Sequence, residues 1–153
     1  MIIKATQFNV NLDKILKKAG DNASAIARKV ALELYTKVVQ KSPVDSGRLR
    51  GNWNVGLNGV DNTEYPIDAS ALGSLPSGSG LTRSASALSS FKIGDTIFIT
   101  NNMPYVYKLE YGLYNDGPKT VGGYSRQAPQ GFVRITYKEV VSDLENISRK
   151  VVK

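Results

Sequence analysis

The sequence predicts an α+β domain spanning residues 1–153, in which two long amphipathic helices pack on a small antiparallel sheet, with a short third helix and two long loops. Two observations predict this class. Apolar residues recur every three or four positions near both ends of the chain, as in helices that bury one face. Between them, Thr96–Thr100 reads T-I-F-I-T, a β-branched and aromatic run that is typical of a strand. The length and the 41% hydrophobic content suffice to bury one core.

The first long helix is expected from about Leu12 to Gln40, with Asn11 as its N-cap. Gly20-Asp21 is expected to kink or split it. Ser42-Pro43 ends it, because the residue before a proline avoids the helical region. The apolar stripe of this helix comprises Ile15, Ala19, Ile26, Val30, Leu34 and Val38.

A compact segment follows, Ser42–Trp53, which reads S-P-V-D-S-G-R-L-R-G-N-W. Asp45 or Ser46 is expected to cap one helical turn that contains Gly47. A strand then follows, and its alternation places one set of side chains on one face: Leu49, Gly51, Trp53, Val55 and Leu57. Trp53 is expected in the core or at an interface rather than as a ligand platform.

The stretch at about 58–83 is predicted to be a flexible excursion, because Ser70–Ser90 contains eight serines and three glycines. A short helix is expected near Arg83–Ser90. The S-G-S-G at Ser77–Gly80 lacks the Lys-Ser/Thr ending of a phosphate-binding loop.

The strand at Thr96–Thr100 is expected to pair with the Trp53 strand. After it, Asn101 or Asn102 is expected to cap a short helix with Pro104 in its first turn and Gly112 as its C-cap. A second loop, Leu113–Arg126, leads to a last helix from about Pro129 to Val151. The apolar face of that helix comprises Val133, Tyr137, Val140, Leu144, Ile147 and Val151.

The chain has no histidine and no cysteine, which excludes Ser-His-Asp and Cys-His catalysis and nearly all zinc ligand sets. No apolar run approaches the roughly 20 residues that a membrane span needs. We therefore expect neither an enzyme nor a cofactor, a metal or a membrane partner.

The net charge is +7, and residues 1–50 carry ten Lys or Arg against four acidic residues. This basic third indicates contact with nucleic acid or an acidic protein surface, unless it is simply a solvated helix face.

Tyrosines recur on the short helix at Tyr107, Tyr111 and Tyr114, which lie four and three residues apart. An exposed tyrosine face favours a protein interface, with base stacking as the alternative. Glu110 at the end of this helix is a candidate partner for Arg48 or Arg50, which would tie the earlier turn to the helix or one subunit to the next. The alternative is that all three side chains are exposed.

Three segments together resemble a known family: Ser42–Trp53, then I-G-D-T-I-F-I-T-N-N-M-P-Y-V-Y-K-L-E-Y-G ending at Gly112, then Q-A-P-Q-G-F-V-R at Gln127–Arg134. In this order they resemble the tail-completion, or tail-component, proteins of tailed bacteriophages. The loop Leu113–Arg126 is longer than the family pattern.

The resemblance implies a virion structural protein, made in the host cytoplasm, that completes the tail and joins it to the head connector. It implies a ring, often hexameric, around the DNA channel, with the tail tube or tail terminator and the connector as partners. A small basic nucleic-acid-binding protein that uses the N-terminal helix is the alternative. The resemblance brings no catalytic residues. The positions that it assigns to the fold and to ring contacts are Gly47, Arg48, Leu49, Arg50, Trp53, Asn101, Asn102, Pro104, Tyr105, Leu109, Glu110, Gly112, Ala128, Pro129, Gly131 and Phe132, to which the tyrosine face adds Tyr107 and Tyr111.

Overall fold

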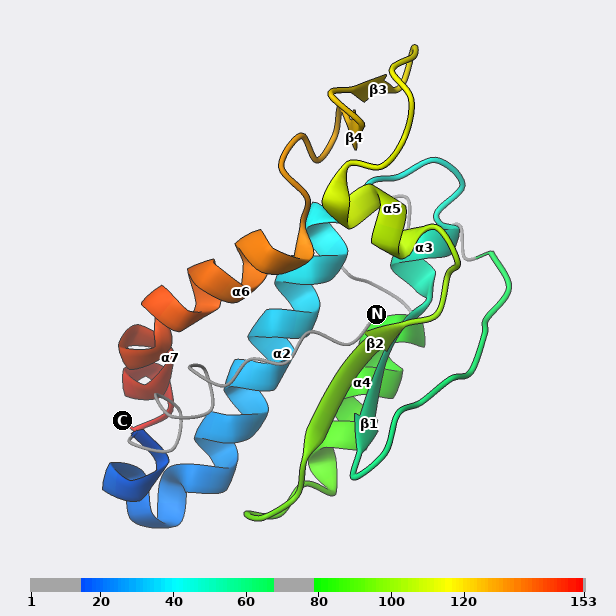
Figure 1. Cartoon of the computed structure of the whole chain (residues 1–153). Coiled ribbons are helices and arrows are strands. Elements are labelled where there is room, and N and C mark those ends of the chain that lie inside the picture. Colours follow the sequence, from blue (N-terminus) through cyan, green and yellow to red (C-terminus); the bar gives the residue numbers. More distant parts are fainter. Residues whose placement is uncertain (1–14, 68–78, 153) are drawn as a thin grey trace.

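The computed structural model describes residues 15–67 and 79–152 and has the predicted α+β architecture (Figure 1). Residues 15–19 are helical, and the first long helix is split as predicted, by a 3-10 turn, η1. The elements then follow in the order η1 Gly20–Asn22, α2 Ala23–Lys41, α3 Arg48–Gly51, β1 Trp53–Leu57, α4 Ser79–Ser89, β2 Ile97–Asn101, α5 Val106–Tyr111, β3 Thr120–Val121, β4 Tyr124–Ser125, α6 Val133–Ser142 and α7 Leu144–Val151. The expected N-cap Asn11 and the residues at 68–78 lie outside the described part of the chain.

Helix α2 is the centre of the fold and buries two of its sides. One side carries Ile26 and Val30, which pack against Val140, Leu144 and Ile147 of the C-terminal helices. The other side packs toward the sheet and α4 through Ala31, Tyr35, Val38 and Val39. The helix ends at Lys41, as predicted, because Ser42 has an extended backbone (ψ 132°) before Pro43.

The sheet pairs β1 with β2 in antiparallel register, with Trp53 opposite Asn101 and Leu57 opposite Ile97. Strand β1 is shorter than predicted, because Leu49 and Gly51 belong to the helical turn α3. One face of the sheet packs on α4, which lies behind it in Figure 1. The predicted helix near Arg83–Ser90 thus exists and begins earlier, at Ser79.

The other face of the sheet lies under the chain that follows β1. The Asn54 amide donates to the carbonyl of Thr63 (2.7 Å), and Asn52 exchanges two hydrogen bonds with the backbone of Tyr65 (2.7 and 3.1 Å). The Arg83 guanidinium lies over the Tyr65 ring, 3.5 Å from its centroid. These contacts hold the chain at residues 63–65 against the sheet, and the flexibility predicted for the stretch at about 58–83 stays a prediction.

The last helix differs from the prediction at its start, in its continuity and in its packing. It begins at Val133 rather than at Pro129, and it breaks at Asp143 into α6 and α7. Both parts pack on α2 rather than on the sheet. Val140 before the break and Ile147 after it are both buried against Ile26 and Val30 of α2.

The loop Leu113–Arg126 carries a small hairpin, β3 paired with β4, that was not predicted. We call residues 113–126 the arm. Figure 1 shows the arm projecting beyond α5 at one end of the molecule.

Candidate assembly site

The three segments that carry the family resemblance meet in the fold at Phe132. The ring of Phe132 is fully buried and packs edge-on against Trp53, with centroids 6.4 Å apart and an interplanar angle of 85°. The Trp53 indole N–H donates to the Ser42 hydroxyl (2.9 Å), which donates in turn to the Val38 carbonyl at the end of α2 (2.6 Å). Trp53 is thus a core residue whose polar atom is satisfied, as the sequence predicted.

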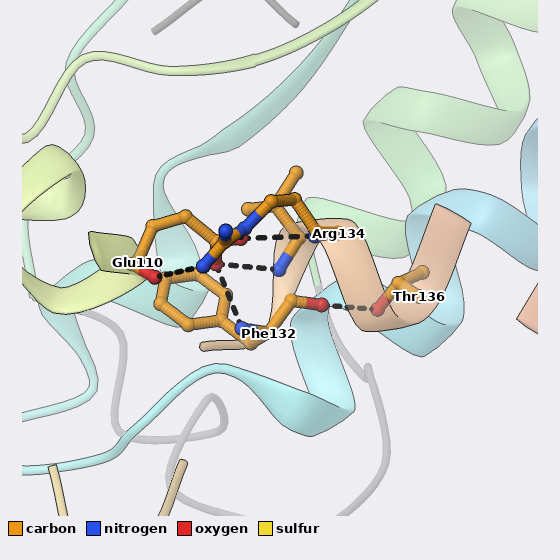
Figure 2. A network of polar contacts seen from close by, with 5 residues as sticks. Glu110, Phe132, Arg134 and Thr136 are labelled. Carbon is orange, nitrogen blue, oxygen red and sulfur yellow. Dashed lines mark hydrogen bonds and ion pairs between the residues drawn. The ribbon is translucent and has the colours of Figure 1, made fainter. Parts of the chain in front are cut away.

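The second segment reaches the same place through Glu110, whose side chain is fully buried (Figure 2). Its carboxylate accepts hydrogen bonds from the backbone N–H groups of Phe132 (2.7 Å), Val133 (2.8 Å) and Arg134 (3.0 Å). These N–H groups lie at the start of α6. The N-cap residue is Phe132, whose side chain has no oxygen to accept a hydrogen bond from them. Glu110 is therefore a helix cap supplied from α5, with its negative charge at the favourable end of the helix dipole.

Arg134 completes this arrangement, which we call the Glu110 clamp. Its guanidinium donates to the Glu110 carboxylate (2.9 Å) and to the Glu110 carbonyl (3.0 Å), and it lies over the ring of Tyr111, 4.6 Å from the centroid. The hydrogen bond to Glu110, and then one to Tyr124, raise the pKa of Arg134. One cation thus joins α5, the arm and α6.

The predicted pairing of Glu110 with Arg48 or Arg50 is wrong. Arg50 instead donates to the carbonyls of Gln40 and Ser42 (both 2.9 Å), at the end of α2, and burial lowers the pKa of its guanidinium. Arg48 is exposed and lies 3.7 Å from Glu64 at the edge of an open hollow of about 350 Å³. The turn α3 places these side chains away from the clamp, because its helical path turns them toward the end of α2 and toward the loop after β1.

Gly47 directly precedes α3 as its N-cap residue and has a φ of 84°. Neither Asp45 nor Ser46 caps α3 as predicted: the hydroxyl of Ser46 receives only a long hydrogen bond from the Arg48 N–H (3.4 Å), and Asp45 pairs with Lys119 of the arm. The single helical turn itself is confirmed, at Arg48–Gly51.

Asn101 and Asn102 were predicted to cap α5, and that prediction is wrong, because the helix begins at Val106 with Tyr105 as its N-cap. Asn101 is buried and accepts from the Met103 N–H (3.0 Å) while its amide donates to the Leu49 carbonyl (2.8 Å). Asn101 thus ties the end of β2 to the turn α3. Asn102 pairs with Asn62 at the surface (3.1 Å).

Gly131 is required where the clamp closes. Its φ of 83° is in the left-handed region, and a Cβ at this position would lie 2.6 Å from the Glu110 carbonyl oxygen and 2.8 Å from its carboxylate. Gly112 ends α5 as predicted, with a φ of 65°. Pro129 is exposed in the turn that leads to Gly131, and Ala128 is buried in the core.

The tyrosine face and the arm gather exposed apolar side chains at one end of the molecule. Tyr107 is 55% exposed and its ring lies 4.7 Å from that of Tyr111. Leu113 (55%) and Val121 (49%) are exposed on the arm. Tyr105 turns inward and packs on the core, where burial raises the pKa of its hydroxyl.

Two polar contacts of this site were not predicted from the sequence. The first is the pairing of Glu110 with Arg134, which are separated by 24 residues. The second is Gln127, whose amide exchanges two hydrogen bonds with the backbone of Val44 (2.7 and 2.8 Å). Both contacts join one of the three resemblance segments to another, so the motifs could have indicated which residues take part. Which residue pairs with which depends on the tertiary fold.

Exposed aromatic side chains such as Tyr107 favour a protein interface, because aromatic residues are enriched there. In the described residues no group of three or more acidic side chains could hold a metal ion, and no helix is long and apolar enough to cross a membrane.

The chain belongs to the family described as "Bacteriophage HK97-gp10, putative tail-component", whose model matches residues 6–112. It is therefore a phage tail component, located in the virion. The match includes Ser42–Trp53 and the strand and helix that end at Gly112, whereas Gln127–Arg134 joins the site by geometry. No curated protein and no solved structure matches the chain.

Proposed function

We propose that this tail component completes the tail and joins it to the head connector as a ring of six identical subunits around the DNA channel, and that it has no catalytic role. The observation that carries the proposal is the tyrosine face with the arm. A ring subunit needs a stiff body and a projecting surface that meets its neighbours. Exposed tyrosines suit that surface, because they add contact area at low entropic cost.

The family positions divide into two groups under this proposal. The buried ones, and the half-buried ones that bond or pack within the fold, maintain it and hold the site together: Gly47, Leu49, Arg50, Trp53, Asn101, Tyr105, Leu109, Glu110, Gly112, Ala128, Gly131 and Phe132. The remaining ones, which are exposed or half-buried, contact neighbouring subunits, the tail tube, the tail terminator or the connector: Arg48, Asn102, Pro104, Tyr107, Tyr111 and Pro129.

The charges of the first third favour assembly over nucleic-acid binding. Lys29 is paired with Glu33 (2.9 Å), and both Lys37 and Lys41 are paired with Glu139 of α6 (2.8 and 3.0 Å). These cations bind α2 to itself and to α6, so they contribute less to a basic surface than their number suggests. A DNA-binding helix would instead present its cations to phosphates.

Size-exclusion chromatography with light scattering, followed by negative-stain imaging, tests the ring. The chain is examined alone and after mixing with tails purified from infections that lack it, since subunits that order on meeting a tail stay monomeric alone. We expect rings at the end of the tail, and tails that then join heads. Tails that bind none of the chain would contradict the proposal.

A variant pair tests the surface itself. Tyr107→Ser removes the most exposed ring of the tyrosine face, and Ile93→Ser removes an apolar side chain of similar exposure (57%) from the turn before β2, at the far end of the sheet from α5. We expect Tyr107→Ser to reduce tail joining about tenfold and Ile93→Ser to leave it unchanged. Equal effects would place the interface elsewhere.

A further inference from the structure

The base of the arm is packed too tightly to move independently of α5. The Tyr114 N–H donates to the carbonyl of Gly123 (3.1 Å), so the turn between β3 and β4 is bonded to the start of the arm. A Cβ on Gly123 would lie within 1.9 Å of the Gly112 carbonyl oxygen, so the backbone of the arm lies directly on the end of α5. The orientation of the arm therefore depends on the contacts that hold α5 and the arm against the neighbouring segments, which include residues 127–134 after the arm.

Three sets of polar contacts fix that relation, and they differ in burial. Lys119 pairs with Asp45 (2.8 Å), and Gln127 bonds to the backbone of Val44; both contacts are exposed to solvent. The Glu110 clamp is the buried one. Because exposed polar contacts exchange with water at little cost, the clamp has the greatest hold on the arm.

We propose that Glu110 is a positioning residue for subunit assembly: its carboxylate fixes the arm beside the tyrosine face, so that the two form one docking surface before a neighbour arrives. This rests on the proposed function, since it assigns the arm to the surface that binds the next copy of the chain. A surface ordered before binding loses less entropy when it binds, so the clamp raises the affinity without touching the partner.

The substitution Glu110→Gln tests the clamp with little change of shape. The amide keeps one acceptor oxygen, but it brings an N–H₂ group toward N–H donors and removes the charge that faces Arg134. The packing of Phe132 on Trp53 is left as it is. The matched control is Glu139→Gln, which removes a carboxylate that also accepts from cations but is 41% exposed.

Amide hydrogen exchange separates arm position from global stability. In Glu110→Gln we expect exchange at residues 112–134 to be faster by about tenfold, with α2 and the sheet protected as before. Tail joining should fall about tenfold at a temperature where the variant is folded, while Glu139→Gln joins normally. Normal joining by a Glu110→Gln chain with a loosened arm would overturn the proposal.

A cross-link supplies the rescue. The chain has no cysteine, so Asp45→Cys with Lys119→Cys can be bridged selectively by a short bis-maleimide, at a place where the two native side chains are 2.8 Å apart. We expect this bridge to restore joining to Glu110→Gln, because it fixes the arm from outside. A bridged variant that stays defective would overturn the proposal. A bridge that blocks joining in the chain with native Glu110 would also overturn the proposal, because the proposal states that the fixed arm is the form that joins tails.

The two proposals fail in different ways. If the unchanged chain neither forms rings nor binds tails, the proposed function is wrong, whatever Glu110 does. If it does both, and Glu110→Gln equals it in exchange and in joining, the positioning role alone is wrong.

Discussion

The arm is bounded by two ion pairs of nearly equal length in opposite surroundings. The pair of Glu110 with Arg134 measures 2.9 Å, and its carboxylate is fully buried. The pair of Asp45 with Lys119 measures 2.8 Å, and its side chains are 84% and 79% exposed. The first carboxylate also receives three backbone N–H groups, whereas the second is otherwise surrounded by water.

The difference teaches that distance alone does not rank these contacts. Backbone N–H groups that lose a buried carboxylate cannot bond to water instead, so removing Glu110 should cost several kcal/mol. An exposed pair exchanges its partner for water and changes the stability by less than about 1 kcal/mol. Substitutions at the two sites should therefore differ widely in effect.

The largest effect is expected for Glu110→Ala, which leaves three N–H groups of α6 without an acceptor. We expect the free energy of unfolding to fall by about 3 kcal/mol, measured by chemical denaturation. Arg134→Ala is the control, since it keeps the backbone cap and removes a side chain that is 43% exposed, and it should cost about 1 kcal/mol. Equal losses from both variants would mean that the ion pair, rather than the cap, stabilises the site.

The next effect is expected for Gly131→Ala, which tests the clamp from the opposite side. The new Cβ meets Glu110 and also adopts a left-handed backbone, so we expect a loss of about 2–3 kcal/mol. Gly122→Ala is a close control, because its φ is 58° and nothing lies within 4 Å of the added atom. We expect Gly122→Ala to cost about 1 kcal/mol by thermal or chemical unfolding. If Gly131→Ala and Gly122→Ala lowered the free energy of unfolding equally, Glu110 would be able to move aside for the methyl group.

Much of the fold follows from local sequence signals. Ser42-Pro43, Gly112 and the strand run at Thr96–Thr100 mark ends and elements through their own conformational preferences, and all three predictions are confirmed to within a residue or two. The α+β class follows from the same signals, because it depends on the kinds of element and their order.

The clamp could not be predicted in the same way. Glu110 caps a helix that begins 23 residues later, so no local pattern at Val133 marks the start of α6, and the nearer Pro129 gave a misleading one. The break at Asp143 likewise has no glycine or proline beside it that would mark it in the sequence. The sequence analysis singled out Glu110, whereas its partner Arg134 depends on how distant segments pack.

Glu139 lies between the two extremes, since its side chain is 41% exposed and pairs with two lysines. The hydrogen bonds from Lys37 and Lys41 lower its pKa. A lowered carboxyl pKa adds stability at neutral pH, and that stability is lost as the pH falls below the ordinary pKa of 4.5. We expect Glu139→Gln to cost less than about 1 kcal/mol at pH 7 and to cost less at pH 3 than at pH 7, measured by denaturation at both values. A loss that persists at low pH would point to packing instead of charge.

The smallest effect is expected for Asp45→Asn, at the exposed end of the comparison. The Lys119 ammonium is as well hydrated without its partner as with it, so the free energy of unfolding should change by less than about 0.5 kcal/mol. Raising the salt concentration of the unchanged chain should reproduce even that small change, because exposed charges are screened. If Asp45→Asn instead matched Glu110→Ala, the arm would be fixed from the turn at residues 43–46, and the buried carboxylate would hold only the helix.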